Sequence, residues 1–228
     1  MEQVILFDLD GTLTDPKTGI TKSVQYALKA YGIEEPDLDK LCPFIGPPLT
    51  DSFREFYGFT PEDDAGALLK YREYFSVTGI FENTVYDGIL QLLDTLSQKG
   101  FTLAVATSKP EAYAEQILEH FDLKKYFKVV GGADMAETRV KKGDVIAYTL
   151  NRLSVDAGKT PVIMVGDRMH DVQGAKENGL PCIGVLFGYG SREELLAAGA
   201  EYLAETVEHL EEVLVSWGQK NELSINSL

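Results

Sequence analysis

The chain has 228 residues, 44% of them hydrophobic, which is enough for one sizeable core or for a core with a small second domain. Its formal net charge of −15 argues against nucleic acids and anionic membranes as partners, and an anionic substrate would need a local positive site. No apolar run is long enough to cross a membrane, and no secretory signal is visible. Because the two cysteines, Cys42 and Cys182, lie far apart, we expect a reduced, cytoplasmic protein.

The first predicted element is a short strand with acidic residues at its end. Residues 4–7 (VILF) form an apolar run, and Asp8, Asp10 and Gly11 follow it. Alternate residues of a strand point the same way, so Asp8 and Asp10 are expected to face one pocket. Gly11 allows the backbone to turn sharply and to approach a ligand closely. Since open α/β folds bind ligands at the carboxyl ends of their strands, this stretch is the first candidate site.

The next region, residues 16–82, is predicted to be entirely helical. A helix at 21–31 has apolar residues along one face and Thr21 as its N-cap, and further helices are expected at 49–57 and 60–75. This region therefore interrupts the chain between the first strand and the next α/β unit.

Beyond residue 82, strands and helices alternate, which predicts a parallel sheet with helical crossovers. Buried strands are expected at 102–106, 128–130, 162–165 and 182–185, with a short edge strand at 202–203. Helices are expected at 88–99, 142–153, 171–178, 191–198 and 207–217, with one more ending near residue 121. The polar tail after Gly218 is expected to fray.

Polar groups also stand at the ends of these later elements, namely Thr107, Ser108 and Lys109, then Lys141 and Lys142, and finally Asp167 and Asp171. Clustered carboxylates repel one another and need a cation, and oxygen ligands suit Mg²⁺. A threonine hydroxyl and nearby backbone N–H groups can donate hydrogen bonds to phosphate, and a lysine adds a positive charge. This combination is typical of phosphoryl transfer, in which positioning and charge neutralisation dominate.

Taken in order, residues 8–15 (DLDGTLTD), Thr107, the lysine pair, and Gly166-Asp167 with Asp171 resemble the four motifs of the haloacid dehalogenase-like phosphohydrolases. The resemblance spans nearly the whole chain. It implies an α/β fold with a Rossmann-like parallel-sheet core, formed by residues 1–15 and 83–228, and a small inserted all-helical cap domain at 16–82. Residues 46–49 (GPPL) and 106–110 (ATSKP) are similar to the family branch that contains phosphoglycolate phosphatases and 5′-nucleotidases.

The resemblance also implies a catalytic or substrate-binding role for individual residues. Asp8 is the nucleophile that forms an aspartyl-phosphate, and Asp10 is first the general acid and then the base that activates water. Thr107, Ser108 and Lys142 bind the phosphoryl group of the substrate.

A metal site is implied by the same resemblance. Mg²⁺ is bound by the Asp8 carboxylate, the Asp10 backbone carbonyl and Asp167, with Asp171 nearby. Because Lys141-Lys142 stands where the family often has Lys-Pro, Lys141 is the alternative to Lys142 as the phosphate ligand. Lys109 is expected at the rim of the pocket, and Arg54 in the cap is a candidate for substrate contact.

These features predict a Mg²⁺-dependent phosphatase that hydrolyses a small phosphorylated metabolite, of phosphoglycolate or nucleoside 5′-monophosphate type, as a monomer or small homo-oligomer. Two alternatives stay open. A phosphomutase would use the same aspartates but return the phosphoryl group to a bound sugar. A regulatory protein would use Asp8 only as a phospho-acceptor. Dehalogenation is disfavoured because a Mg²⁺-type acidic set has no place in that chemistry.

Overall fold

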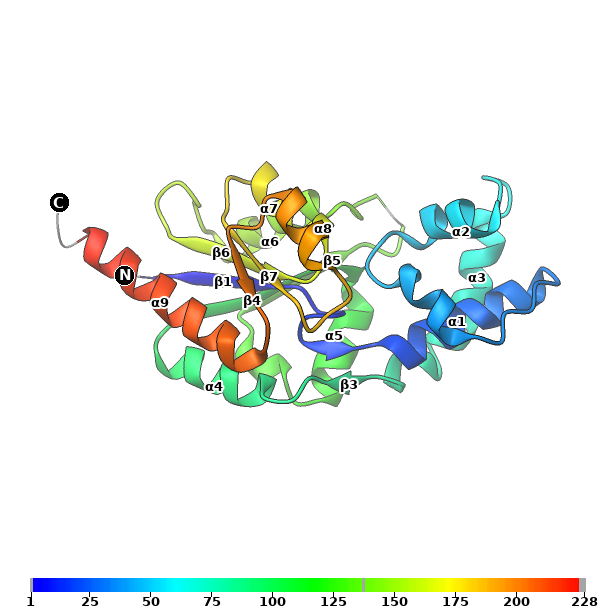
Figure 1. Cartoon of the computed structure of the whole chain (residues 1–228), viewed down its shortest axis with the longest axis horizontal. Helices are drawn as coiled ribbons and strands as arrows, with labels where there is room; N and C mark the ends of the chain where they lie inside the picture. The colour runs from blue at the N-terminus through cyan, green and yellow to red at the C-terminus, as the bar shows by residue number, and fades with distance from the viewer. Residues whose placement is uncertain (1, 137, 226–228) are drawn as a thin grey trace. The chain divides into compact units, whose positions relative to one another are not determined.

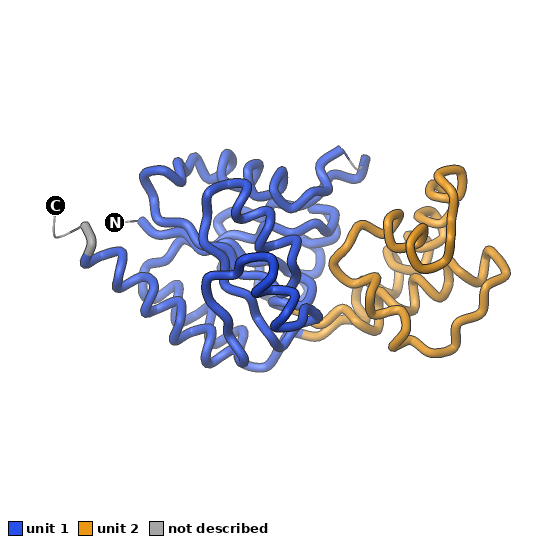
Figure 2. Tube along the Cα trace, turned by 45° about the horizontal axis from the view of Figure 1, so that its top comes forward, with its two compact units in different colours: residues 1–13, 85–228 blue, residues 14–84 orange. Residues whose placement is uncertain are grey.

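The computed structural model describes residues 2–136 and 138–225, and the chain forms two compact units (Figure 2). Unit 1 comprises residues 1–13 and 85–228, and unit 2 comprises residues 14–84. Unit 2 contains the helical region that interrupts the α/β pattern. Its role as a cap over the site, with boundaries at 16 and 82, stays a prediction.

Unit 1 is built on a six-stranded sheet in which all paired strands run parallel, in the order β5-β4-β1-β6-β7-β8. The strands are β1 (Val4–Phe7), β4 (Thr102–Pro110), β5 (Val129–Ala133), β6 (Val162–Gly166), β7 (Cys182–Val185) and β8 (Tyr202–Ala204). With its surrounding helices, this sheet confirms the predicted α/β fold with a Rossmann-like core.

β1 lies in the middle of the sheet because all four of its side chains are apolar and can be buried on both faces. Each of them is 0% exposed. Val4 and Leu6 belong to a core cluster with residues of the helices on one face. Phe7 points to the other face and packs edge-on against Phe127, with ring centroids 6.3 Å apart. The strand that carries the first motif is therefore fixed from both sides.

The helices of unit 1 cover both faces of the sheet (Figure 1). They are α4 (Ile89–Gln98), α5 (Glu111–His120), α6 (Lys142–Leu153), α7 (Met169–Glu177), α8 (Arg192–Ala198) and α9 (Val207–Ile225), with a short 3₁₀ helix η3 (Lys124–Tyr126). In Figure 1, α6, α7 and α8 lie on one face, and α4 and α9 lie on the other. None of the helices in the described part of the chain has the length and apolar character to cross a membrane.

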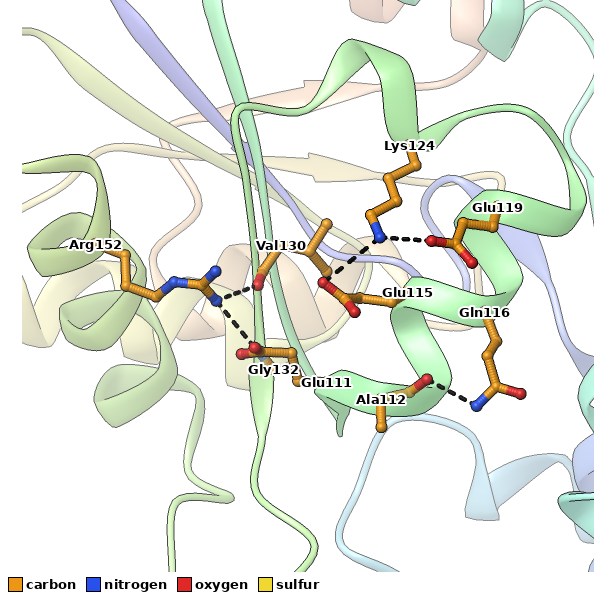
Figure 3. Close-up of polar contacts among 9 residues, drawn as sticks. All are labelled: Glu111, Ala112, Glu115, Gln116, Glu119, Lys124, Val130, Gly132 and Arg152. Atoms are coloured by element: carbon orange, nitrogen blue, oxygen red, sulfur yellow. Dashed lines mark hydrogen bonds and ion pairs between the residues drawn. The ribbon is translucent and has the colours of Figure 1, made fainter.

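β5 is an edge strand, and side chains of α5 and α6 cover its exposed backbone (Figure 3). The Arg152 guanidinium donates to the Val130 carbonyl at 2.7 Å and lies 2.9 Å from the Glu111 carboxylate. Glu111 in turn accepts a hydrogen bond from Gly132 N–H at 3.3 Å. An unpaired strand edge can pair with other chains, and these contacts block that route.

Unit 2 contains α1 (Lys17–Ala30), α2 (Leu49–Tyr57), α3 (Asp64–Phe75) and two 3₁₀ segments, η1 (Leu38–Phe44) and η2 (Gly79–Phe81). Two short strands, β2 (Thr14–Asp15) and β3 (Thr84–Val85), pair where the chain passes between the units. Aromatic rings form much of the core of unit 2: Phe53 packs on Phe44 and on Phe59, with centroids 5.0 and 5.1 Å apart.

Two predictions of local structure are wrong. Thr21 does not cap α1, because the Asp15 carboxylate already accepts a hydrogen bond from Lys17 N–H at 3.0 Å, and the helix begins at Lys17. The chain after Gly218 is helical as far as it is described, because α9 continues to Ile225, and residues 226–228 lie outside the described residues. Gly218 serves close packing there: an added Cβ would lie 2.5 Å from the Phe101 ring.

Candidate active site

Polar residues at or near the carboxyl ends of three neighbouring strands meet at one edge of the sheet. β1 lies between β4 and β6, so the predicted site residues Asp8 and Asp167, which follow β1 and β6, lie beside Thr107, which is near the end of β4. All three side chains are buried. Asp8 N–H donates to the Val165 carbonyl at 2.9 Å, which extends the β1–β6 pairing by one residue and fixes the backbone of Asp8. The predicted convergence of these residues thus follows from strand order.

Lys142 reaches this edge from the first turn of α6. Its Nζ lies 2.7 Å from Asp8 Oδ1 and 2.9 Å from Asp171 Oδ1, and it donates to the Ala106 carbonyl at 3.2 Å. Burial alone would lower the pKa of Lys142, but the charges of Asp171 and Asp8 raise it above its usual range. Lys141 is exposed. Of the two candidate lysines, the structure therefore brings Lys142 to the aspartates, as a permanently charged group.

Three carboxylates form a buried cluster in the described part of the chain. Asp8, Asp167 and Asp171 each offer an oxygen, and these oxygens lie within 4.8 Å of one another. Burial, followed by repulsion from Asp171 and Asp8, raises the pKa of Asp167 well above its usual range. Burial likewise raises the pKa of Asp171 to about 6, although Lys142 opposes the rise.

This donor set fits a hard divalent cation. Asp167 Oδ2 accepts a hydrogen bond from Tyr189 N–H at 2.8 Å, whereas Asp167 Oδ1 is buried without a hydrogen-bond partner among the described residues. A cation such as Mg²⁺ would satisfy that oxygen and relieve the repulsion between the carboxylates. Asp171 also stabilises α7, because its Oδ2 accepts a hydrogen bond from Arg168 N–H at 3.0 Å.

Asp10 is not part of the carboxylate cluster, because its side chain pairs with Lys109. Lys109 Nζ lies 2.5 Å from Asp10 Oδ2, and both side chains are almost fully buried. Burial raises the pKa of Asp10, and the Lys109 charge offsets part of that rise. The expectation that Lys109 lies at the pocket rim is wrong, because β4 continues to Pro110 and carries Lys109 inward. A strand prediction that extended to Pro110 would have placed Lys109 in the sheet, but no local signal marks Asp10 as its partner.

Ser108, between Thr107 and Lys109 on β4, is half-buried. Its contact with substrate stays a prediction. Arg54, the candidate in unit 2, pairs with the carboxylates of Asp51 and Asp64.

Gly11 is required both by its backbone conformation and by its contact with Asp167. Its φ is +82°, and an added Cβ would lie 2.2 Å from Asp167 Oδ2. Gly100 has a similar φ of +85°, but no atom lies within 4 Å of the corresponding Cβ position. The two glycines therefore form a matched pair that separates backbone strain from the steric effect on the carboxylate.

We expect Gly100→Ala to lower the free energy of unfolding by about 1–2 kcal/mol, because it places alanine at positive φ. Gly11→Ala should lower it by more, because its added Cβ also meets the Asp167 carboxylate. Only Gly11→Ala should also weaken Mg²⁺ binding, by about 10-fold or more, because it displaces a carboxylate of the cluster. Urea unfolding and calorimetric Mg²⁺ titration measure the two effects. Equal Mg²⁺ affinities for the two variants would contradict this account of Gly11.

Comparisons with known proteins match most of the chain. Residues 5–185 match the family model described as haloacid dehalogenase-like hydrolase. A protein from Pseudomonas aeruginosa named 5′-nucleotidase is 48% identical over 212 residues, which cover 93% of this chain and 95% of that protein. Tyrosine-protein kinase PtkA from Mycobacterium tuberculosis is 38% identical over 215 residues, covering 93% of this chain and 72% of that protein. The crystal structure of a predicted phosphatase from Clostridium acetobutylicum has a TM-score of 0.91 and 48% identity, and the match covers 94% of this chain and 98% of that one.

Proposed function

We propose that this chain, which belongs to the haloacid dehalogenase-like hydrolase family and is a phosphoric monoester hydrolase, is a Mg²⁺-dependent phosphatase acting through an aspartyl-phosphate. The family resemblance predicted from the motifs is confirmed by the match over residues 5–185. The observation that carries the proposal is the buried cluster of Asp8, Asp167 and Asp171 with Lys142 paired to Asp8. It combines a nucleophilic carboxylate, a cation site and a fixed positive charge.

In the proposed reaction, an oxygen of Asp8 attacks phosphorus as the bond from phosphorus to the leaving oxygen breaks. Asp10 donates a proton to that leaving oxygen, and it then takes a proton from the water that hydrolyses the aspartyl-phosphate. Lys142 and Thr107 hold the phosphoryl oxygens, with Ser108 as a further ligand. Asp8, Asp167 and Asp171, together with the Asp10 backbone carbonyl, would hold Mg²⁺, which would supply the charge neutralisation that two anions need to approach each other.

We propose a nucleoside 5′-monophosphate as the first substrate class to test, because the relative from Pseudomonas aeruginosa is named 5′-nucleotidase. Phosphoglycolate is the second class. At a net charge of −15, the field of the whole protein repels such anions, so Lys142 and the cation must supply the local attraction. We propose further that residues 16–82 act as a cap, and that the protein is cytoplasmic and a monomer or small homo-oligomer.

Phosphate release from a panel of phosphomonoesters, with Mg²⁺ or with a chelator, tests this proposal. The panel holds nucleoside 5′-monophosphates, phosphoglycolate, sugar phosphates and p-nitrophenyl phosphate. We expect release only with Mg²⁺, and a rise in melting temperature on adding Mg²⁺ without substrate, because the ion binds the folded state. Undiminished release in chelator, after metal analysis shows the protein to be metal-free, would contradict the metal assignment.

A second candidate is phosphoryl transfer to tyrosine, because the relative from Mycobacterium tuberculosis is named a tyrosine-protein kinase. It would require ATP as donor and a tyrosine hydroxyl as acceptor. Incubation with ATP and a tyrosine-containing protein distinguishes the two functions. Phosphotyrosine formed without release of free phosphate would favour the kinase. Conversion of a hexose phosphate into an isomeric hexose phosphate, without release of free phosphate, would favour a phosphomutase.

A further inference from the structure

Lys109 and Asp10 form a buried ion pair two residues from the proposed nucleophile. Their charged atoms lie 2.5 Å apart, and the side chains are 5% and 12% exposed. Burying two charges costs hydration, and a buried pair adds little net stability compared with apolar residues of the same size. Stability alone therefore does not explain why a lysine stands at this point of β4.

Lys109 reaches Asp10 through an irregular end of β4. The register between β4 and β5 shifts between Thr107 and Pro110, and Lys109 N–H donates to Thr107 Oγ1 at 3.2 Å. Lys109 thus extends from the same strand end that supplies the proposed phosphate ligand Thr107. The other buried lysine, Lys142, pairs with Asp8 and Asp171, so the two lysines contact different carboxylates.

The ion pair makes the two oxygens of Asp10 unequal. Asp10 Oδ2 accepts a hydrogen bond from Lys109 Nζ, whereas Asp10 Oδ1 is buried and has no hydrogen-bond partner among the described residues. A buried acceptor without a partner is costly, so this oxygen is ready for a proton or for a group of the substrate.

We propose that Lys109 is a positioning residue for the reaction: it holds Asp10 Oδ2 so that Oδ1 exchanges the proton with the leaving oxygen. This inference rests on the proposed function. As phosphorus passes from the leaving oxygen to Asp8, the proton on Oδ1 moves to the leaving oxygen. Without Lys109 the carboxyl group can rotate, and the proton is then poorly placed for transfer.

Leaving groups of different basicity reveal such a role. An alkoxide needs the proton in order to depart, whereas p-nitrophenolate leaves as a stable anion. Lys109→Met removes the charge and keeps an unbranched apolar side chain. We expect kcat/KM to fall about 100-fold or more for the alkyl phosphate that the wild type hydrolyses fastest, and less than about 10-fold for p-nitrophenyl phosphate.

kcat/KM is the suitable quantity because it covers the steps up to departure of the leaving group. Lys128→Met is the control, because Lys128 is 58% exposed and pairs only loosely with Glu2, at 3.4 Å, in the same unit. It should leave kcat/KM unchanged for both substrates. Equal losses for both substrates in Lys109→Met would show a structural or phosphate-binding role, and would overturn the inference.

Lys109→Met alone leaves the Asp10 charge buried and unpaired, and a double variant avoids this problem. When Asp10→Asn and Lys109→Met are combined, neither side chain carries a charge. Relative to Asp10→Asn alone, the double variant should show a kcat/KM for p-nitrophenyl phosphate that is lower by less than about 2-fold. A larger additional loss would mean that Lys109 acts on the substrate directly, which would also overturn the inference. Failure of the proposed function is distinguishable, because the wild type itself would then release no phosphate.

Discussion

Phosphate release is expected to fall by at least about 10⁴-fold when Asp8 is replaced by Asn, because an amide oxygen cannot act as the nucleophile. The side chain keeps its size, and Asp8 N–H still donates to the Val165 carbonyl, so the strand end should keep its conformation. Initial rates with the best substrate of the panel, measured beside circular dichroism of the purified variant, test this expectation.

The matched control for this variant is Asp156→Asn. Asp156 is an exposed carboxylate that pairs with Lys159 on the surface, and such pairs contribute little to stability. Its replacement should leave the rate unchanged. Turnover by Asp8→Asn within about 10-fold of the wild type would remove Asp8 from the role of nucleophile.

The second large effect is expected for Lys142→Met, which removes a cation from between two buried carboxylates. Breaking such a buried ion pair costs about 3–5 kcal/mol of unfolding free energy, because Asp8 and Asp171 are left to repel each other. Activity should fall as well, since Lys142 is the proposed ligand of the phosphoryl group. Added Mg²⁺ should restore part of the lost stability, because it supplies positive charge to the same oxygens.

Urea unfolding of Lys142→Met, with and without Mg²⁺, measures this effect. Lys141→Met is the matched control, because the neighbouring side chain is exposed and should contribute little to stability or activity. If Lys141→Met loses activity and Lys142→Met does not, Lys141 is the phosphate ligand, and Lys142 serves only to stabilise the carboxylates of Asp8 and Asp171.

The sequence predicts the centre of the fold well, because there the local hydrophobic pattern and the burial in the folded chain agree. The apolar run Val4–Phe7 can only be satisfied by burial on both faces, and it forms the middle strand. The closeness of Asp8 and Asp167 follows from strand order, since residues after adjacent parallel strands must lie close together, and Asp171 joins them from the first turn of α7.

Features set by contacts distant in sequence are not visible in the local pattern. Glycine commonly ends a helix, but Gly218 lies inside α9, where Phe101 packs against it and Gln3 donates a hydrogen bond to its carbonyl. Lys109 belongs to the same class, because nothing in its neighbours predicts that Asp10 will lie 2.5 Å away. The prediction that Thr21 caps α1 is wrong for a local reason. The helix begins four residues earlier, at Lys17, whose N–H donates to the Asp15 carboxylate.

The most direct test of the central claim is mass spectrometry of the enzyme after rapid acid quenching during turnover of p-nitrophenyl phosphate with Mg²⁺. We expect a phosphoryl group on the peptide that contains Asp8, stable in acid and lost in mild alkali, and absent from Asp8→Asn. Steady phosphate release without any phosphorylated peptide, or with the phosphoryl group on another residue, would contradict the claim that Asp8 is the nucleophile.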